Sequence, residues 1–228
     1  MAIKIGLMVP ANNTTMEAEF LAWLPAGATC RTLRIPRQKG LLTQADIPDY
    51  VSKGESIAAD FRKDPVDLLV YGCTAAGILA GPERDAAIAV SLGKITGSPV
   101  VTTASSMVAS LRGEGAKDIA LVTPYSDEVN ARLEAFLAQS EIQVRRMRSL
   151  GAENVEALGA IGAREVAGLA RETVDEGCDA LFIACSQLPT RAIVGPLEKE
   201  FRKPVWSSIK ATAWRAAQEL RVPLRDEG

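Results

Sequence analysis

The strongest constraint on the fold is that the chain repeats its own pattern in two halves. Short apolar runs rich in Val, Ile and Leu alternate with helical periods, at 3–9, 30–35, 67–72 and 99–103 and again at 118–123, 144–150, 180–185 and 204–208. Apolar runs separated by helices are typical of parallel sheets covered on both faces. The pattern therefore predicts an α/β protein made of two similar lobes.

Landmark residues recur in the two halves at nearly the same separation. The matched pairs are Pro10 with Pro124, Cys73 with Cys185, and Gly81-Pro82 with Gly195-Pro196. The prolines at 10 and 124 end the first run of each half, and the cysteines end the third run. We expect each Gly-Pro pair to open a helix, because proline favours the first helical position.

The two strand-end cysteines are the most informative side chains. In open parallel sheets, ligands bind beyond the carboxyl ends of the strands, where helix N-termini present free N–H groups. If the lobes face each other, Cys73 and Cys185 approach one cleft from opposite sides. Thr74 and Ser186 follow them as candidate N-cap residues. Helix-start N–H groups favour a thiolate, so we expect lowered thiol pKa values and a nucleophile or base near neutral pH.

Composition narrows the chemistry further. The chain has 228 residues, of which 47% are hydrophobic. Its net charge of −2 provides no positive potential that would attract nucleic acid or an anionic membrane. It contains no histidine, which excludes a Ser-His-Asp triad, a Cys-His pair and an imidazole zinc site. Thiols are then the expected proton carriers. Cys30 and Cys178 stand at strand entries and are expected to be structural.

Other signatures point to a small-molecule partner inside the cell. The N-terminal run is too short for a signal peptide and no apolar stretch reaches membrane-spanning length, so we expect a cytoplasmic protein with reduced thiols. The cysteines lack metal-ligand spacing, so no metal is expected. Neither Gly-rich phosphate motif occurs, which argues against a dinucleotide or nucleoside triphosphate. Homo-oligomers, and dimers above all, are the commonest assemblies of soluble proteins, so we expect a homodimer or a higher homo-oligomer.

Three further polar residues lie just beyond predicted strands. Asn13 is expected to cap a helix, to offer its amide to a carboxylate, or to do both. Tyr125 follows the first strand of the second half, where its phenol donates a hydrogen bond to a ligand or packs at the rim. Asn154 lies in a loop, either as a solvated turn residue or as a ligand contact.

Together these segments resemble the aspartate/glutamate racemase superfamily, most closely its maleate cis-trans isomerase branch, over nearly the whole chain. The resemblance rests on "VPANNTTMEAEF", "YGCTA", "VTPYSDEVN", "GAENVEALG" and "IACSQLP". It implies two lobes with a four-stranded parallel sheet each, a C-terminal helix that returns to the first lobe, a cleft between the lobes that holds both cysteines, and no cofactor. We expect a first lobe of 1–103 with 210–228 and a second of 104–209.

The resemblance also implies an activity. It assigns the nucleophile to Cys73 and its acid/base partner to Cys185, and it maps substrate-holding residues onto Asn13, Tyr125 and Asn154. Maleate, a small dicarboxylate, would become fumarate by cysteine addition, bond rotation and elimination. Its carboxylates would also be held by the N–H groups behind the cysteines, at Thr74, Ala75, Ser186 and Gln187.

Three alternatives stay open at this point. The chain is also similar to arylmalonate decarboxylases, but that branch has glycine at the first cysteine position, so Cys73 argues against decarboxylation. A racemase or epimerase of an amino acid or hydantoin would use both cysteines as bases on opposite faces of the substrate. A noncatalytic two-lobed binding protein would leave the paired cysteines unexplained.

Overall fold

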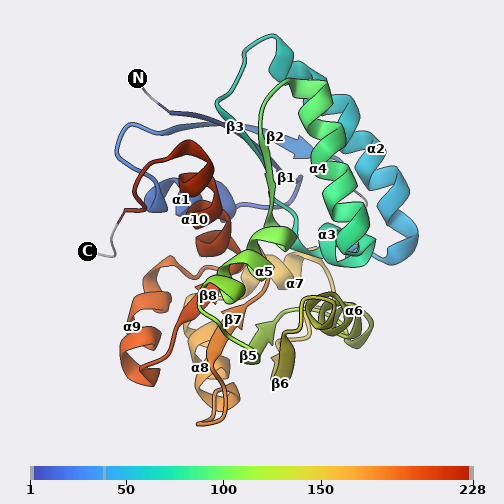
Figure 1. Ribbon diagram of the computed structural model, residues 1–228. Coiled ribbons are helices and arrows are strands. Elements are labelled where there is room, and N and C mark those ends of the chain that lie inside the picture. Colours follow the sequence, from blue (N-terminus) through green and yellow to red (C-terminus); the bar gives the residue numbers. More distant parts are fainter. Residues whose placement is uncertain (1–2, 38–39, 226–228) are drawn as a thin grey trace.

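The computed structural model describes residues 3–37 and 40–225 and contains two four-stranded sheets (Figure 1). The first has the order β2-β1-β3-β4, formed by β1 (Lys4–Pro10), β2 (Thr29–Ile35), β3 (Leu68–Tyr71) and β4 (Val100–Thr102). The second has the order β6-β5-β7-β8, formed by β5 (Asp118–Thr123), β6 (Gln143–Ser149), β7 (Ala180–Ile183) and β8 (Val205–Ser207). All neighbouring strands are parallel. The shared strand order confirms the two-lobed α/β fold.

Helices connect the strands. In the first half they are α1 (Met16–Trp23), α2 (Ile47–Ala58), α3 (Thr74–Ala80), α4 (Pro82–Thr96) and α5 (Thr103–Gly113), with short 3-10 turns at Gln44–Asp46 and Ala59–Arg62. In the second half they are α6 (Asp127–Ala138), α7 (Val155–Ala160), α8 (Ala163–Thr173), α9 (Arg191–Phe201) and α10 (Ser208–Leu220).

The first sheet is buried on both faces, as its continuous apolar runs predict. Alternate residues of β3 point to opposite sides: Leu69 packs with the core under α2 and α4, whereas Val70 packs with α1 and α10. Ile209 and Ala213 of α10 belong to that second cluster. The C-terminal helix therefore lies on the first sheet, beside α1 (Figure 1). The exact lobe boundaries expected from the sequence stay a prediction.

The repeat extends to helix caps. Thr102 ends β4 and its Oγ1 accepts a hydrogen bond from the Ser105 N–H at 3.1 Å at the start of α5. Ser207 ends β8, and its Oγ accepts from the Lys210 N–H at 3.1 Å at the start of α10. These caps fix the helix starts at the carboxyl edges of both sheets.

The two halves differ after their third strands. In the first half, α3 follows Cys73 directly and Pro82 then begins α4. In the second half, the chain turns over 186–190 without a short helix, and α9 begins at Arg191, so that Pro196 lies inside it. The expectation that Gly195-Pro196 opens a helix is therefore wrong. The landmark pairs match in sequence, but the backbone after the third strand adopts a different conformation in the second half.

Gly77 offers a test of the packing that holds α3 behind Cys73. A Cβ at this position would lie 2.5 Å from the Ala104 Cβ and 2.6 Å from an Asp85 carboxylate oxygen. Because α3 must shift to relieve this overlap, we expect Gly77→Ala to lower the free energy of unfolding by about 1–3 kcal/mol in urea titrations.

Gly168→Ala is the matched control. Gly168 lies within α8, and a Cβ there meets nothing within 4 Å. This change should raise the free energy of unfolding by about 0.5–1 kcal/mol, because alanine loses less backbone entropy in a helix. Equal effects of the two substitutions would contradict the close packing of α3.

Candidate active site

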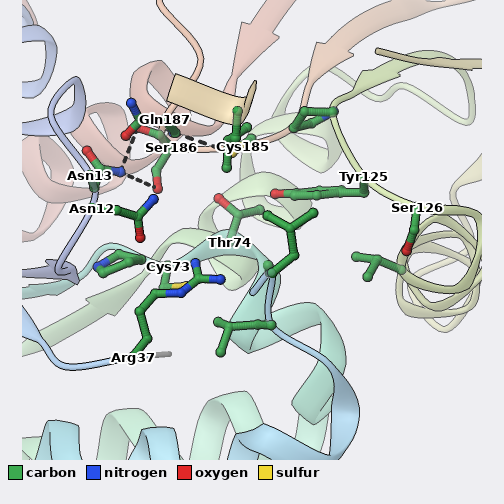
Figure 2. Close-up of a pocket in the computed structure, with 17 residues that line it drawn as sticks. Asn12, Asn13, Arg37, Cys73, Thr74, Tyr125, Ser126, Cys185, Ser186 and Gln187 are labelled. Carbon is green, nitrogen blue, oxygen red and sulfur yellow. Dashed lines mark hydrogen bonds between the residues drawn. The ribbon is translucent and has the colours of Figure 1, made fainter. Parts of the chain in front are cut away.

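A pocket lies between the carboxyl edges of the two sheets and is lined by 17 residues from both lobes (Figure 2). It encloses about 600 Å³, including its open mouth. Eight of the nine site residues that the sequence predicts line it: Asn13, Cys73, Thr74, Ala75, Tyr125, Cys185, Ser186 and Gln187.

Asn154 is the predicted site residue that does not line this pocket. Its side chain is exposed at the start of α7, where its Oδ1 accepts a hydrogen bond from the Ala157 N–H at 2.8 Å. It therefore acts as the N-cap of α7 in this structure. One turn later the same helix sends Leu158 into the pocket wall.

Cys73 is buried at the point where β3 turns into α3. It is itself the N-cap of α3, and Thr74 is the first helical residue, so the prediction that Thr74 is the cap is wrong by one position. Burial raises the pKa of the Cys73 thiol, while the N–H of Ala76, the Tyr50 hydroxyl and the Arg37 charge act in the opposite direction. The helix start lowers the cost of a thiolate here without removing it.

Cys185 is buried on the opposite side of the pocket in a strained conformation. Its φ of 132° lies in a region that L-residues rarely adopt, at a cost of about 1–3 kcal/mol. This conformation directs its N–H to the Ser208 Oγ at 2.9 Å, and its Sγ accepts the Gln187 N–H at 3.4 Å. Burial raises the pKa of the Cys185 thiol to about 11.

The expectation of lowered thiol pKa values is therefore wrong for the unliganded protein. The sequence correctly places both cysteines beside backbone N–H groups, but it does not show how completely they are buried: Cys73 is 4% exposed and Cys185 7%. Removal of the thiolates from water outweighs the N–H groups that face them.

Each cysteine lies near a tyrosine hydroxyl. The Tyr50 hydroxyl faces Cys73, and the Tyr125 hydroxyl faces Cys185. Both hydroxyl oxygens are buried without a hydrogen-bond partner among the described residues. Burial first, and then the neighbouring thiols, raise the pKa of both phenols well above its ordinary value. Both tyrosines thus stay protonated and can donate a hydrogen bond to sulfur or to a ligand.

Hydrogen bonds between the lobes run alongside the pocket. The Asn13 Oδ1 accepts the Met16 N–H at 2.9 Å at the start of α1, although the N-cap position itself is Thr15, and its Nδ2 donates to the Ser186 carbonyl at 3.1 Å. The Gln187 Oε1 accepts the Thr14 N–H at 3.0 Å, and its Nε2 donates to the Thr14 Oγ1 at 3.1 Å. Both side chains therefore join the first lobe to the turn after Cys185, and Figure 2 shows the Asn13 bonds to Ser186.

Ser186 does not cap a helix, contrary to the expectation, because the chain after it forms a turn. Its Oγ instead donates to the Gly72 carbonyl at 2.9 Å, next to Cys73. A second set of contacts lies at the start of α9, where the Glu19 carboxylate accepts the N–H groups of Thr190 at 2.9 Å and Arg191 at 3.1 Å. These contacts fix the distance between the segments that carry Cys73 and Cys185.

Several pocket residues were not selected from the sequence. Asn12 lines the pocket with a buried Oδ1 that has no hydrogen-bond partner among the described residues. Arg37 is the one charged residue of the described lining. Both lie just beyond strands, β1 and β2, so the strand-end rule that found Cys73 would also have found them. An apolar wall completes the pocket: Leu41, Leu42, Val129 and Leu158.

The described residues contain no group of three or more His, Cys, Asp or Glu side chains that could hold a metal ion. No helix among them is both long and apolar enough to cross a membrane.

Known proteins resemble the chain over most of its length. A family model described as arylmalonate decarboxylase matches residues 5–228. A maleate isomerase of Nocardia farcinica is 27% identical over 99% of this chain and 93% of its own. An arylmalonate decarboxylase of Bordetella bronchiseptica is 31% identical over 64% of this chain and 61% of its own. The crystal structure of a maleate isomerase from Pseudomonas putida superposes with a TM-score of 0.92 at 26% identity, covering 99% of this chain and 96% of that one.

The raised thiol pKa values predict slow alkylation of the unliganded protein. We expect iodoacetamide at neutral pH to label Cys73 and Cys185 more slowly than in the urea-unfolded chain. Labelling of Cys185 should rise with pH up to about 11, because its thiolate forms only as pH approaches that pKa. Peptide mass spectrometry over a pH series measures both rates. A midpoint at or below about 8.5, the value of a free thiol, would contradict the dominance of burial.

Proposed function

We propose that this chain, which belongs to the arylmalonate decarboxylase family and within it to the maleate isomerase branch, converts maleate or a close cis-enedioate to its trans isomer without a cofactor. One observation carries the proposal: two buried cysteines from different lobes line the same small pocket. Two thiols on opposite sides of a bound alkene match a reaction that adds a nucleophile to one carbon and a proton to the next.

The proposed reaction needs only these two groups. The Cys73 thiolate forms a C–S bond to one alkene carbon, and the π electron pair moves to the neighbouring carbon beside a carboxylate. The Cys185 thiol gives that carbon its proton, which leaves a single bond free to rotate. After rotation, the Cys185 thiolate takes a proton back, the trans double bond re-forms, and the C–S electron pair returns to Cys73.

The charges near the two cysteines differ, and the difference suits Cys73 as the nucleophile and Cys185 as the acid. Burial raises the pKa of both thiols, and each thiol faces two backbone N–H groups and a tyrosine hydroxyl, but Cys73 also faces the positive charge of Arg37, which favours its thiolate. Cys185 has a pKa raised to about 11 and therefore stays protonated. This asymmetry supports Cys73 as the nucleophile and Cys185 as the acid.

The carboxylates of the substrate need local donors, because the protein has no overall positive charge. We assign this role to the N–H groups that follow the cysteines, at Thr74, Ala75, Ser186 and Gln187, and to two polar side chains at the pocket, Asn12 and Tyr125. The Asn13 Nδ2 already donates to the Ser186 carbonyl and Oγ, so Asn13 supports the site by holding the turn after Cys185. Tyr125 is the best placed of the donors, since its buried hydroxyl has no other partner among the described residues. Asn154 is left out of this set because its side chain is exposed.

The test is the appearance of fumarate from maleate, followed by the alkene proton signals in NMR. We expect Cys73→Ala to abolish turnover, with a loss of at least about 10⁴-fold, because it removes the nucleophile. Cys185→Ser should also lose most turnover, since a serine hydroxyl is a poorer acid than a thiol. Cys178→Ser is the matched control: Cys178 is buried at the entry of β7, and its loss should leave turnover within about twofold.

Two outcomes would overturn this assignment. An active Cys73→Ala variant would remove the nucleophile from the proposal. A wild-type protein that leaves maleate unchanged, but exchanges the α-proton of an amino acid or hydantoin with deuterium oxide, would be a two-cysteine racemase instead. The cytoplasmic location and homo-oligomeric state expected from the sequence stay predictions.

A further inference from the structure

Arg37 favours the Cys73 thiolate, but the proposed function gives it no contact with the substrate. It lies two residues beyond the end of β2, and it lines the pocket with its guanidinium beside Cys73 (Figure 2). The described pocket lining contains no Lys, Asp or Glu. Arg37 is therefore the one charged side chain that the described lining presents to this cavity.

Only some of the hydrogen-bond donors of the Arg37 guanidinium have a partner among the described residues. Its Nη2 donates to the Gly40 carbonyl, which holds the side chain in place. Its Nε is buried and has no hydrogen-bond partner among the described residues. A buried N–H without a partner is destabilising, and a charged donor especially so. An anion in the pocket would supply the missing acceptor.

The protein's own acidic side chains near Arg37 do not take this role. Asp46 lies close enough for the Arg37 charge to act on it, but its Oδ2 accepts the Thr43 N–H at 2.8 Å and the Thr43 Oγ1 at 2.6 Å. Asp49 lines a neighbouring pocket with Arg37 and Asp46, but its carboxylate forms an ion pair with Lys53. Among the described residues no carboxylate forms an ion pair with Arg37, and the Cys73 thiol and Tyr50 phenol beside it are protonated. The guanidinium therefore keeps hydrogen-bond donors for a ligand.

We propose that Arg37 is the specificity-determining residue of this site: it binds the second carboxylate of a dicarboxylate whose first carboxylate lies on the N–H groups behind the cysteines, and it favours the Cys73 thiolate during attack. Guanidinium groups bind carboxylates strongly in partly buried sites. The site should accordingly select dianions over monoanions of the same shape. The selection of a dicarboxylate alkene rests on the proposed function, whereas the binding of an anion beside Cys73 does not.

The first experiment measures anion binding without any isomerase activity. Iodoacetate and iodoacetamide alkylate the same thiol, but only iodoacetate carries a carboxylate. At a fixed pH of about 8.5, near the pKa of a free thiol, we compare their labelling rates at Cys73 with the ratio in the unfolded chain. In the wild type we expect folding to raise the iodoacetate-to-iodoacetamide ratio about tenfold or more. In Arg37→Gln the ratio should return to that of the unfolded chain.

Two variants control for charge and folding. Arg164→Gln removes an exposed arginine on α8, outside the described pocket lining, and should keep the wild-type ratio. Arg37→Lys keeps the charge but not the forked geometry, and it should restore part of the preference. A preference that persists in Arg37→Gln, or that disappears equally in Arg164→Gln, overturns the proposal.

The second experiment measures selectivity in turnover. We expect Arg37→Gln to lower kcat/KM for maleate by about 10–100-fold more than for the monoamide of maleate, which loses only the support that Arg37 gives to the Cys73 thiolate. Equal losses of kcat/KM on both substrates would show that Arg37 does not bind the second carboxylate. If the wild type alkylates with an Arg37-dependent preference yet never isomerises maleate, the anion site stands and the proposed function fails.

Discussion

Hydrogen bonds between the carboxyl edges of the two sheets hold the two cysteine turns face to face. Asn13 and Gln187 join the turn after β1 to the turn after β7, and Ser186 reaches the carbonyl of Gly72 beside Cys73. All of these groups are buried or half-buried, so each lost partner would leave a desolvated polar atom. The pocket exists because these bonds fix one lobe against the other, and every chemical role proposed for the site depends on that spacing.

Burial sets the electrostatics of this site more than helix geometry does. The N–H groups behind Cys73 and Cys185 stabilise negative charge, yet both thiols keep raised pKa values because water is excluded from them. A reactive thiolate therefore needs a further source of stabilisation in the pocket. The asymmetry between the lobes supplies it on one side: Arg37 faces Cys73, while no charged residue of the described lining comes from the second lobe. A pseudo-symmetric scaffold thus carries two cysteines with different tasks.

Much of this arrangement could be predicted from the sequence, because it depends on local patterns. The eight apolar runs became eight strands, and the strand-end position of Cys73 and Cys185 placed both at one pocket. What failed depends on tertiary contacts. Pro196 is predicted to begin a helix, but it lies inside α9. Asn154 is predicted to contact a ligand, but it caps α7 at the surface. Arg37 follows a strand end as Cys73 does and could have been selected by the same rule, whereas the degree of thiol burial was missed because it depends on side chains from both lobes that surround the pocket.

The central claim is that two thiols from different lobes face each other across one small pocket. A short bifunctional alkylator such as 1,3-dibromoacetone tests this directly, since its three-carbon bridge joins only two sulfur atoms that are separated by about the thickness of a small substrate. We predict one bridge per chain, with the peptides that hold Cys73 and Cys185 joined in the mass spectrum of the native protein and separate when the chain is unfolded before the reaction. Alkylation of single cysteines alone, or a bridge that excludes either of these two, would contradict the account.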